Sequence, residues 1–127
     1  MLHKIFVVDD DKFFAEMLSD YLSNNKMYNV QVIPTGKECI DRLHEQPDVI
    51  ILDYHLDSVN KGGDNGMAIL EKIKKANNKI HVVMLSSQMH YGVAATTIAK
   101  GAEQYIIKDE EAFKNLDLIL KDMIKVA

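Results

Sequence analysis

Cysteine is nearly absent from this sequence of 127 residues, in which Cys39 is the only one. A single cysteine can form neither a disulfide within the chain nor a thiolate metal cluster. An excess of basic residues is also lacking, because 15 Lys and Arg stand against 19 Asp and Glu, for a formal charge of −4. Since binding to nucleic-acid phosphates requires clustered positive charge, this balance disfavours direct nucleic-acid binding.

Long apolar runs are missing as well. No segment approaches the ~18 apolar residues that a membrane-spanning helix requires. The N-terminal sequence MLHKIFVVDDD has only four consecutive apolar residues before its aspartates, which is too few for a secretory signal. We therefore expect a soluble cytoplasmic protein without a membrane partner. With 47% hydrophobic residues, we expect residues 1–127 to fold as one domain, with no separate output domain.

Five short runs rich in Val, Ile and Leu predict β-strands at residues 5–8, 30–33, 49–52, 82–85 and 105–107. They show little polar alternation, which is typical of parallel strands covered on both faces. Between them, apolar residues recur at helical spacing. These stripes are Phe13, Met17, Tyr21 and Phe14, Leu18, Leu22; Cys39, Ile40, Leu43; Met67, Leu70, Ile73; Val93, Ala94, Ile98; and Phe113, Leu116, Leu120, Met123, Ile124. The alternation predicts an α/β fold, a doubly wound sheet of five parallel strands in (βα)5 order.

Polar residues follow four of the predicted strands, at the edge where ligands bind in such folds. They are Asp9, Asp10 and Asp11; Asp53; Ser86 and Ser87; and Lys108. Carboxylates that converge at one edge repel one another, and a divalent cation with oxygen ligands relieves the repulsion. A lysine and a hydroxyl at the same edge can bind phosphoryl oxygens. These are the groups that phosphoryl transfer to an aspartate requires.

The segments VVDDD, VIILD, VVMLSS and YIIK occur in this order at the ends of the first, third, fourth and fifth predicted strands. In this order and spacing, the sequence resembles the receiver domain of bacterial two-component response regulators over essentially its whole length. The resemblance implies the CheY-like, flavodoxin-like strand order 2-1-3-4-5. It also implies a phosphorylation-dependent signalling switch, and not an enzyme that acts on a separate substrate.

The resemblance assigns the acceptor and metal sites. Asp53 would be the phosphoacceptor, and would also ligate Mg²⁺ or Mn²⁺ together with Asp10 and the backbone carbonyl of His55. Asp9 would hold the metal largely through water. The resemblance further implies that His55 and Gln88, each two residues after a site residue, tune the rate at which the phosphorylated aspartate is hydrolysed.

The resemblance also assigns the switch. Ser86 and Lys108 would bind the phosphoryl group, and Tyr105 would turn inward when Ser86 moves toward it. The fourth helix, fifth strand and fifth helix would then change as a surface, and we hypothesise that Met89 and Tyr91 contribute to it.

The partners implied by the resemblance are a sensor histidine kinase or a histidine phosphotransfer protein as phosphoryl donor, and a downstream protein or fused output domain. Some receivers also form weak dimers, and the sequence carries no decisive signal for or against one.

Two departures from the family pattern stand out. Asp109 follows Lys108 where the family usually has proline, often in cis, so we expect a trans peptide here, because a cis bond without proline costs ~3 kcal/mol. Asp57 replaces a proline near the acceptor, and residues 57–66 form a longer segment than is usual in the family, with Gly62 and Gly63 inside it. We hypothesise that this segment modulates access to Asp53 or the choice of partner; a neutral insertion is the alternative.

Other interpretations stay open from the sequence. Asp10 or Asp11 could cap the first helix, and Ser86 or Ser87 could cap the fourth. A degenerate receiver that binds partners without phosphorylation is one alternative function. A small aspartyl-phosphate phosphatase is another, although Phe13 stands where that class requires threonine. A flavodoxin-like flavin carrier is disfavoured, because three aspartates would repel its phosphate.

Overall fold

Five parallel strands lie at the centre of the structure in the order β2-β1-β3-β4-β5. The structure is a computed structural model that describes residues 2–56 and 65–124. Its strands are β1 (His3–Val8), β2 (Tyr28–Ile33), β3 (Val49–Asp53), β4 (His81–Ser86) and β5 (Gln104–Ile107). Each contains the apolar run that predicted it, and every strand pair is parallel. The predicted five-stranded doubly wound sheet is confirmed.

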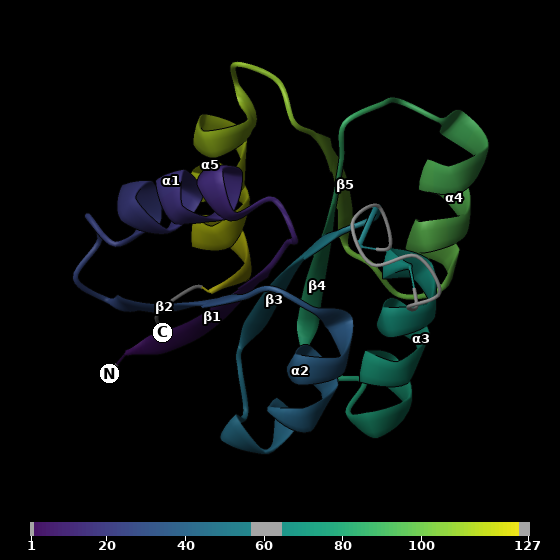
Figure 1. The fold of residues 1–127 in the computed structure, drawn as a ribbon, viewed down its shortest axis with the longest axis horizontal. Coiled ribbons are helices and arrows are strands. Elements are labelled where there is room, and N and C mark those ends of the chain that lie inside the picture. Colours follow the sequence, from purple (N-terminus) through teal and green to yellow (C-terminus); the bar gives the residue numbers. More distant parts are fainter. Residues whose placement is uncertain (1, 57–64, 125–127) are drawn as a thin grey trace.

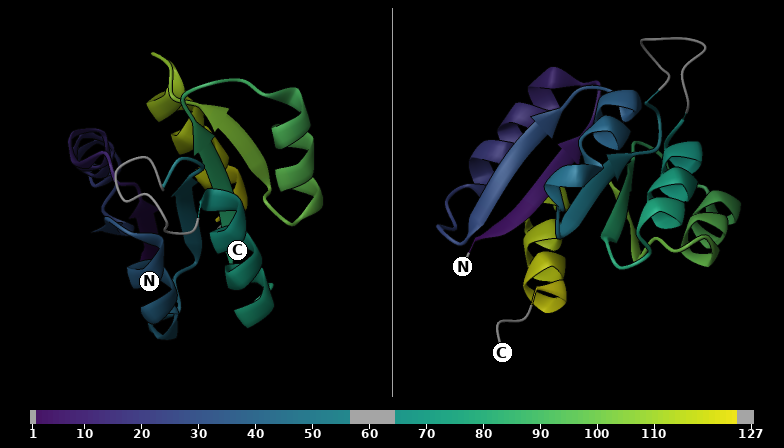
Figure 2. Two further views of the ribbon diagram at one scale, coloured as in Figure 1. Left: turned by 45° about the vertical axis from the view of Figure 1, so that its right-hand side comes forward. Right: turned by 90° about the horizontal axis from the view of Figure 1, so that it is seen from below.

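Helices cover both faces of this sheet (Figure 1). On one face lie α1 (Lys12–Leu22) and α5 (Ala112–Met123), and on the other lie α2 (Gly36–Asp41), α3 (Gly66–Ala76) and α4 (Tyr91–Ala99). The two further views in Figure 2 show the same three layers. Within residues 2–56 and 65–124, no helix is both long and apolar enough to cross a membrane.

The core consists of two layers of side chains, one on each face of the sheet. Phe6 and Val8 of β1 pack with α2 and α3, whereas Ile5 and Val7 of the same strand pack with α1 and α5. Burial on both faces explains why the strand sequences lack polar alternation. Cys39 lies in the first layer, as its place on an apolar stripe predicted, and burial raises the pKa of its thiol to about 12.

The helical stripes are only partly buried. In α1, the stripe with Leu18 and Leu22 faces the sheet, whereas Phe13 and Met17 of the other stripe are 75% and 46% exposed. In α4, the predicted stripe is wrong in its last member, because Ile98 is exposed. The stripe predicted for α2 also runs past the helix, since α2 ends at Asp41 and the short 3₁₀ turn η1 (Leu43–Glu45) follows.

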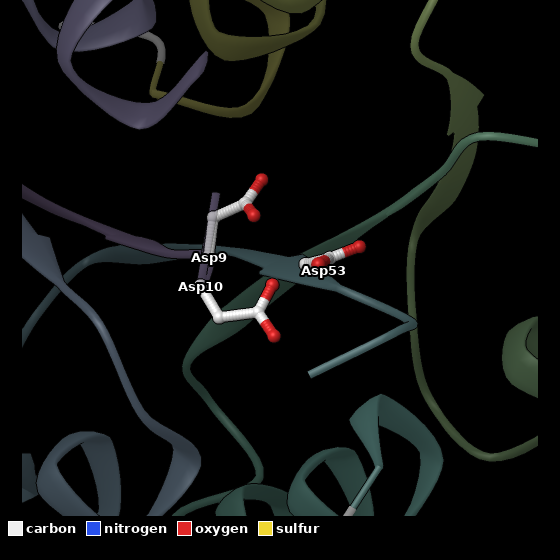
Figure 3. Close-up of side chains that lie close together, drawn as sticks. All are labelled: Asp9, Asp10 and Asp53. Carbon is white, nitrogen blue, oxygen red and sulfur yellow. The ribbon is translucent and has the colours of Figure 1, made fainter. Parts of the chain in front are cut away.

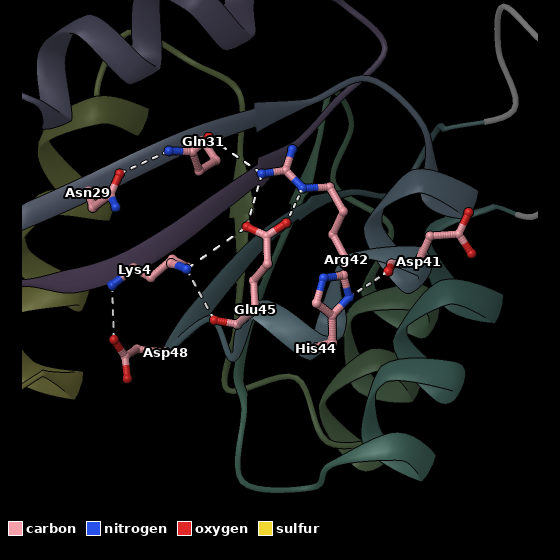
Figure 4. Close-up of polar contacts among 8 residues, drawn as sticks. All are labelled: Lys4, Asn29, Gln31, Asp41, Arg42, His44, Glu45 and Asp48. Carbon is pink, nitrogen blue, oxygen red and sulfur yellow. Dashed lines mark hydrogen bonds and ion pairs between the residues drawn. The ribbon is translucent and has the colours of Figure 1, made fainter.

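A polar network joins β1 and β2 to residues 42–48, which connect α2 to β3 (Figure 4). Arg42 donates from Nε and Nη2 to the two carboxylate oxygens of Glu45, at 2.7 and 3.1 Å, and lies over the Phe6 ring. The Lys4 ammonium donates to the Glu45 carbonyl, and the backbone N–H of Lys4 donates to Asp48. These groups lie toward the amino ends of β1 and β3, away from the edge where the acidic residues gather.

Candidate functional site

Three carboxylates gather where β1 and β3 end. Val8 and Leu52 are register partners on these neighbouring strands, so the residues that follow them lie side by side. Asp9 is 1% exposed and Asp53 is 3% exposed. One oxygen each from Asp9, Asp10 and Asp53 lies within 4.8 Å of the others. Figure 3 shows the side chains of Asp9 and Asp10 extending from the end of β1 toward that of Asp53.

The turn after β1 has a distinct role for each of its three aspartates. The Asp11 side chain accepts from the Phe14 N–H at 3.1 Å and caps α1, so Asp11 is the capping residue of the two that the sequence left open. The Asp11 N–H in turn donates to Asp9 Oδ1 at 2.9 Å. This turn directs Asp9 into the protein and leaves Asp10, half-buried, on the cleft side of the cluster.

Lys108 brings a cation to the cluster from the end of β5. Its Nζ lies 2.8 Å from Asp9 Oδ2 and 3.5 Å from Asp53 Oδ1, so the predicted convergence of Lys108 with Asp53 is confirmed. The backbone N–H of Lys108 donates to the Ser86 carbonyl at 2.8 Å, which fixes the start of the side chain. No peptide of the described residues is cis, as expected for a lysine followed by Asp109.

Phe14 is a site neighbour that the sequence did not reveal as such. The Lys108 ammonium lies 4.6 Å from the centroid of the Phe14 ring, at the distance of a cation–π contact. The Phe14 ring packs edge-on against Phe113 of α5. The only available signal was its position one turn after the aspartates, since Phe14 otherwise looks like any core residue of α1.

Burial and mutual repulsion disfavour the ionised forms of the carboxyl groups in this cluster. Burial, together with the nearby charge of Asp53, raises the pKa of Asp9 to about 6 from 3.8. Burial also raises the pKa of Asp53, although Lys108 and the His55 N–H, 3.2 Å from Asp53 Oδ1, act in the opposite direction. For Lys108, burial lowers the pKa, but the two carboxylates outweigh it and the net pKa is raised.

These residues fit a divalent cation. The buried Asp9 Oδ2 lies 2.8 Å from the Lys108 ammonium and accepts no other hydrogen bond among residues 2–56 and 65–124. Hard carboxylate oxygens that lie close together are the ligands that Mg²⁺ and Mn²⁺ prefer. A cation here would relieve the mutual repulsion that raises the pKa of the carboxyl groups.

The hydroxyls of Ser86 and Tyr105 meet at one backbone oxygen. Ser86 Oγ donates to the Gln88 carbonyl at 2.9 Å, and the Tyr105 hydroxyl donates to the same oxygen at 3.1 Å. Ser86 is fully buried and does not cap α4. The residue before that helix is His90, whose side chain makes no capping bond either. Ser86 and Tyr105 are therefore linked through Gln88.

An open cleft of about 330 Å³ lies against Asp10 and Asp53 of this cluster. Its lining consists of Asp10, Asp11, Asp53, His55, Ser87, Gln88 and Lys108. His55 stacks edge-on against Tyr54, and its Nε2 is buried with no hydrogen-bond partner in the described chain. A small charged group can thus reach the Asp53 carboxylate from solvent. The role predicted for residues 57–66 falls largely outside the described residues, which resume at Asn65.

Comparison with known proteins agrees with this geometry. A model of the family described as "Response regulator receiver domain" matches residues 5–122. The chain belongs to this family. The receiver resembles the chemotaxis protein CheY of Bacillus subtilis, with 26% identity over 97% of this chain and 99% of CheY.

Longer relatives contain the same unit. The receiver is 34% identical, over 92% of its length, to a protein-glutamate methylesterase/protein-glutamine glutaminase of Colwellia psychrerythraea, of which it spans 31%. Among solved structures, it superposes on the receiver domain of DrrB activated by BeF3 with a TM-score of 0.85 and 25% identity, covering 99% of this chain and all of the other. The chain is therefore a receiver domain of the two-component type with an acidic pocket of Asp9, Asp10 and Asp53 beside Lys108.

Proposed function

We propose that this receiver accepts a phosphoryl group on Asp53 from a phosphohistidine and acts as a signalling switch. The observation that carries the proposal is that Asp53 opens into a solvent cleft with the Lys108 ammonium 3.5 Å from its Oδ1. An Asp53 oxygen would attack phosphorus, the bond from phosphorus to the histidine nitrogen would break, and the nitrogen would retain its electron pair. Lys108 would pair with the charge on the transferred group.

The carboxylates of Asp10 and Asp53 and the His55 carbonyl would hold a Mg²⁺ or Mn²⁺ ion, and Asp9 would support it. When bound, the ion would supply charge neutralisation for the phosphoryl oxygens. Asp9 accepts from the Asp11 N–H and pairs with the Lys108 ammonium, and so holds the Lys108 side chain within the site. His55 and Gln88 line the cleft, which supports their assignment as residues that control how water reaches phosphorylated Asp53.

Phosphorylation of Asp53 can be tested by intact mass after incubation with acetyl phosphate and Mg²⁺. We expect wild type to gain one phosphoryl group and Asp53→Ala to gain none, because the Asp53 carboxylate both lines the cleft and lies beside the Lys108 ammonium, whereas Asp9 pairs with Lys108 without lining the cleft. Asp20→Ala, which removes an exposed carboxylate of α1, serves as the matched control and should be modified like wild type. Equal modification of Asp53→Ala, or none of wild type, would refute the proposal.

The switch would run through the Gln88 carbonyl. When a phosphoryl group occupies the site, Ser86 would exchange the Gln88 carbonyl for a phosphoryl oxygen, and Tyr105 would lose its shared contact. Met89 and Tyr91, which follow Gln88 closely in the chain, are 48% and 82% exposed. Their exposure supports a partner surface over α4, β5 and α5, for a downstream protein or an output domain. In this role the receiver promotes only its own phosphorylation and dephosphorylation.

Removing the Tyr105 hydroxyl should separate the site from this surface. BeF3⁻ with Mg²⁺ is a suitable probe, because the similar DrrB receiver is described as activated by BeF3. In amide NMR spectra of wild type, we expect shifts at the cleft and in α4. In Tyr105→Phe the cleft shifts should remain, while those in α4 should shrink, because only the Gln88 contact is lost. Tyr21→Phe on α1 should behave like wild type; if Tyr105→Phe does so too, Tyr105 has no switch role.

A further inference from the structure

Residues 53–55 form the turn that follows the proposed acceptor, here called the acceptor turn. Gly66 approaches the backbone of this turn more closely than any residue with a side chain could. It is the first residue of α3, which Asn65 caps by accepting from the Ala68 N–H at 3.0 Å. A Cβ atom on Gly66 would lie 2.5 Å from the Asp53 carbonyl oxygen and 2.6 Å from the Cα of Tyr54. Both neighbours are backbone atoms, so a side chain at this position must displace either the turn or the helix.

The turn that a side chain at Gly66 would displace is the one that contains Asp53. The Gly66 N–H donates to the Tyr54 carbonyl at 2.9 Å, and the Tyr54 N–H donates to the Leu85 carbonyl at 2.8 Å. The turn is thus fixed by β4 on one side and by the start of α3 on the other. The next N–H, that of His55, contacts the Asp53 carboxylate itself.

We propose that Gly66 is a positioning residue, whose missing side chain lets α3 begin against Asp53 and Tyr54 and so sets the geometry of the divalent-cation site. The inference rests on the proposed function, since it concerns the same site. Gly66 has no side chain that could bind a cation or a phosphoryl group, and it would act only through the backbone from Asp53 to His55.

Gly36 provides a matched comparison within the same molecule. It is likewise buried, is the first residue of α2, and follows a side-chain cap, Thr35. A Cβ atom on Gly36 would lie 2.5 Å from Cδ1 of Ile69, which is the end of a side chain. The same substitution at the two glycines therefore causes similar crowding, but only at Gly66 does the crowding fall on the acceptor turn.

The test measures Mg²⁺ affinity by calorimetry, and the free energy of unfolding by urea titration, for Gly66→Ala, Gly36→Ala and Asn65→Ala. We expect Gly66→Ala to bind Mg²⁺ about tenfold more weakly or worse, as for other residues that orient metal ligands. Gly36→Ala should lose stability because of crowding, and Asn65→Ala because α3 loses its cap. Both variants should still bind Mg²⁺ within about twofold of wild type. Wild-type affinity in Gly66→Ala, or an equal loss in Gly36→Ala, would overturn the inference.

A measurement on wild type decides the matter if Gly66→Ala does not fold. In an NMR titration with Mg²⁺, the amide resonance of Gly66 should move with the same midpoint as that of His55, whereas the resonance of Gly36 should stay in place. A stationary Gly66 resonance would refute the inference. If wild type binds no Mg²⁺ at all, the proposed function fails as well; if it binds and only the Gly66 results disagree, the inference alone fails.

Discussion

The metal-free protein is expected to lose about 3 kcal/mol of stability as the pH rises from 3.8 to about 6, because of Asp9 alone. Asp9 is buried beside Asp53, and both burial and that neighbour disfavour its ionised form. In the unfolded chain the carboxyl group loses its proton near pH 3.8, whereas in the folded protein it keeps the proton until about pH 6. Between these values the folded state holds a proton that the unfolded state has released, so rising pH favours unfolding. Above about pH 6 the whole loss of stability, about 3 kcal/mol, remains.

Urea unfolding followed by circular dichroism across this pH range measures the effect. Asp9→Asn should abolish this component of the pH dependence and be more stable than wild type at pH 7.5, since it removes the buried charge. Asp20→Asn should keep the wild-type dependence, because Asp20 is exposed. Saturating Mg²⁺ should also flatten the wild-type profile, because the ion binds the ionised site in the folded state only. A slope that is the same in wild type and Asp9→Asn would contradict the prediction.

The sheet could be predicted because burial on both faces leaves a direct trace in the sequence. Each strand is a short run of branched apolar residues, and parallel pairing requires a helix between successive runs. The helix faces were less predictable. In α1, the stripes that contain Phe13 and Phe14 are about equally apolar, and only packing against β1 and α5 decides that Phe14 turns inward. In α4, Thr97 is buried instead of Ile98, with its hydroxyl bonded to the Ala94 carbonyl.

The convergence of the site could be predicted for a topological reason. Parallel strands end at the same edge, and β1 and β3 are neighbours, so the residues that follow them must meet. The long Lys108 side chain reaches the same point from β5, although β4 lies between β5 and β3. Contacts to backbone atoms could not be predicted, because they leave no residue type to recognise. The meeting of Ser86 and Tyr105 at the Gln88 carbonyl is of this kind. Gly66 can be recognised as a glycine, but the sequence does not show that it approaches the backbone of Asp53. Nor does topology predict that Lys108 lies closer to Asp9 than to Asp53, or that its ammonium lies beside the Phe14 ring.

Removing the Lys108 ammonium should destabilise the metal-free protein strongly. Lys108→Met leaves the carboxylates of Asp9 and Asp53 buried without their cation, and breaking a buried pair in this way costs ~3 kcal/mol at pH 7.5. At pH 5 the loss should be smaller, because the Asp9 carboxyl, whose pKa is already raised to about 6, can take up a proton instead. Urea unfolding at the two pH values measures both effects. Lys121→Met, which removes an exposed partner of Asp117, should be nearly neutral.

Lys108→Met should change Mg²⁺ binding and phosphorylation in opposite directions. Without the ammonium 2.8 Å from Asp9, the acidic cluster attracts a divalent cation more strongly, so Lys108→Met should bind Mg²⁺ more tightly than wild type and regain much of its lost stability. The same variant should take up the phosphoryl group of acetyl phosphate far more slowly, because the charge opposite Asp53 is gone. Calorimetry and intact mass separate the two. If Lys108→Met bound Mg²⁺ more weakly, or were phosphorylated at the wild-type rate, Lys108 would be only a structural counter-ion.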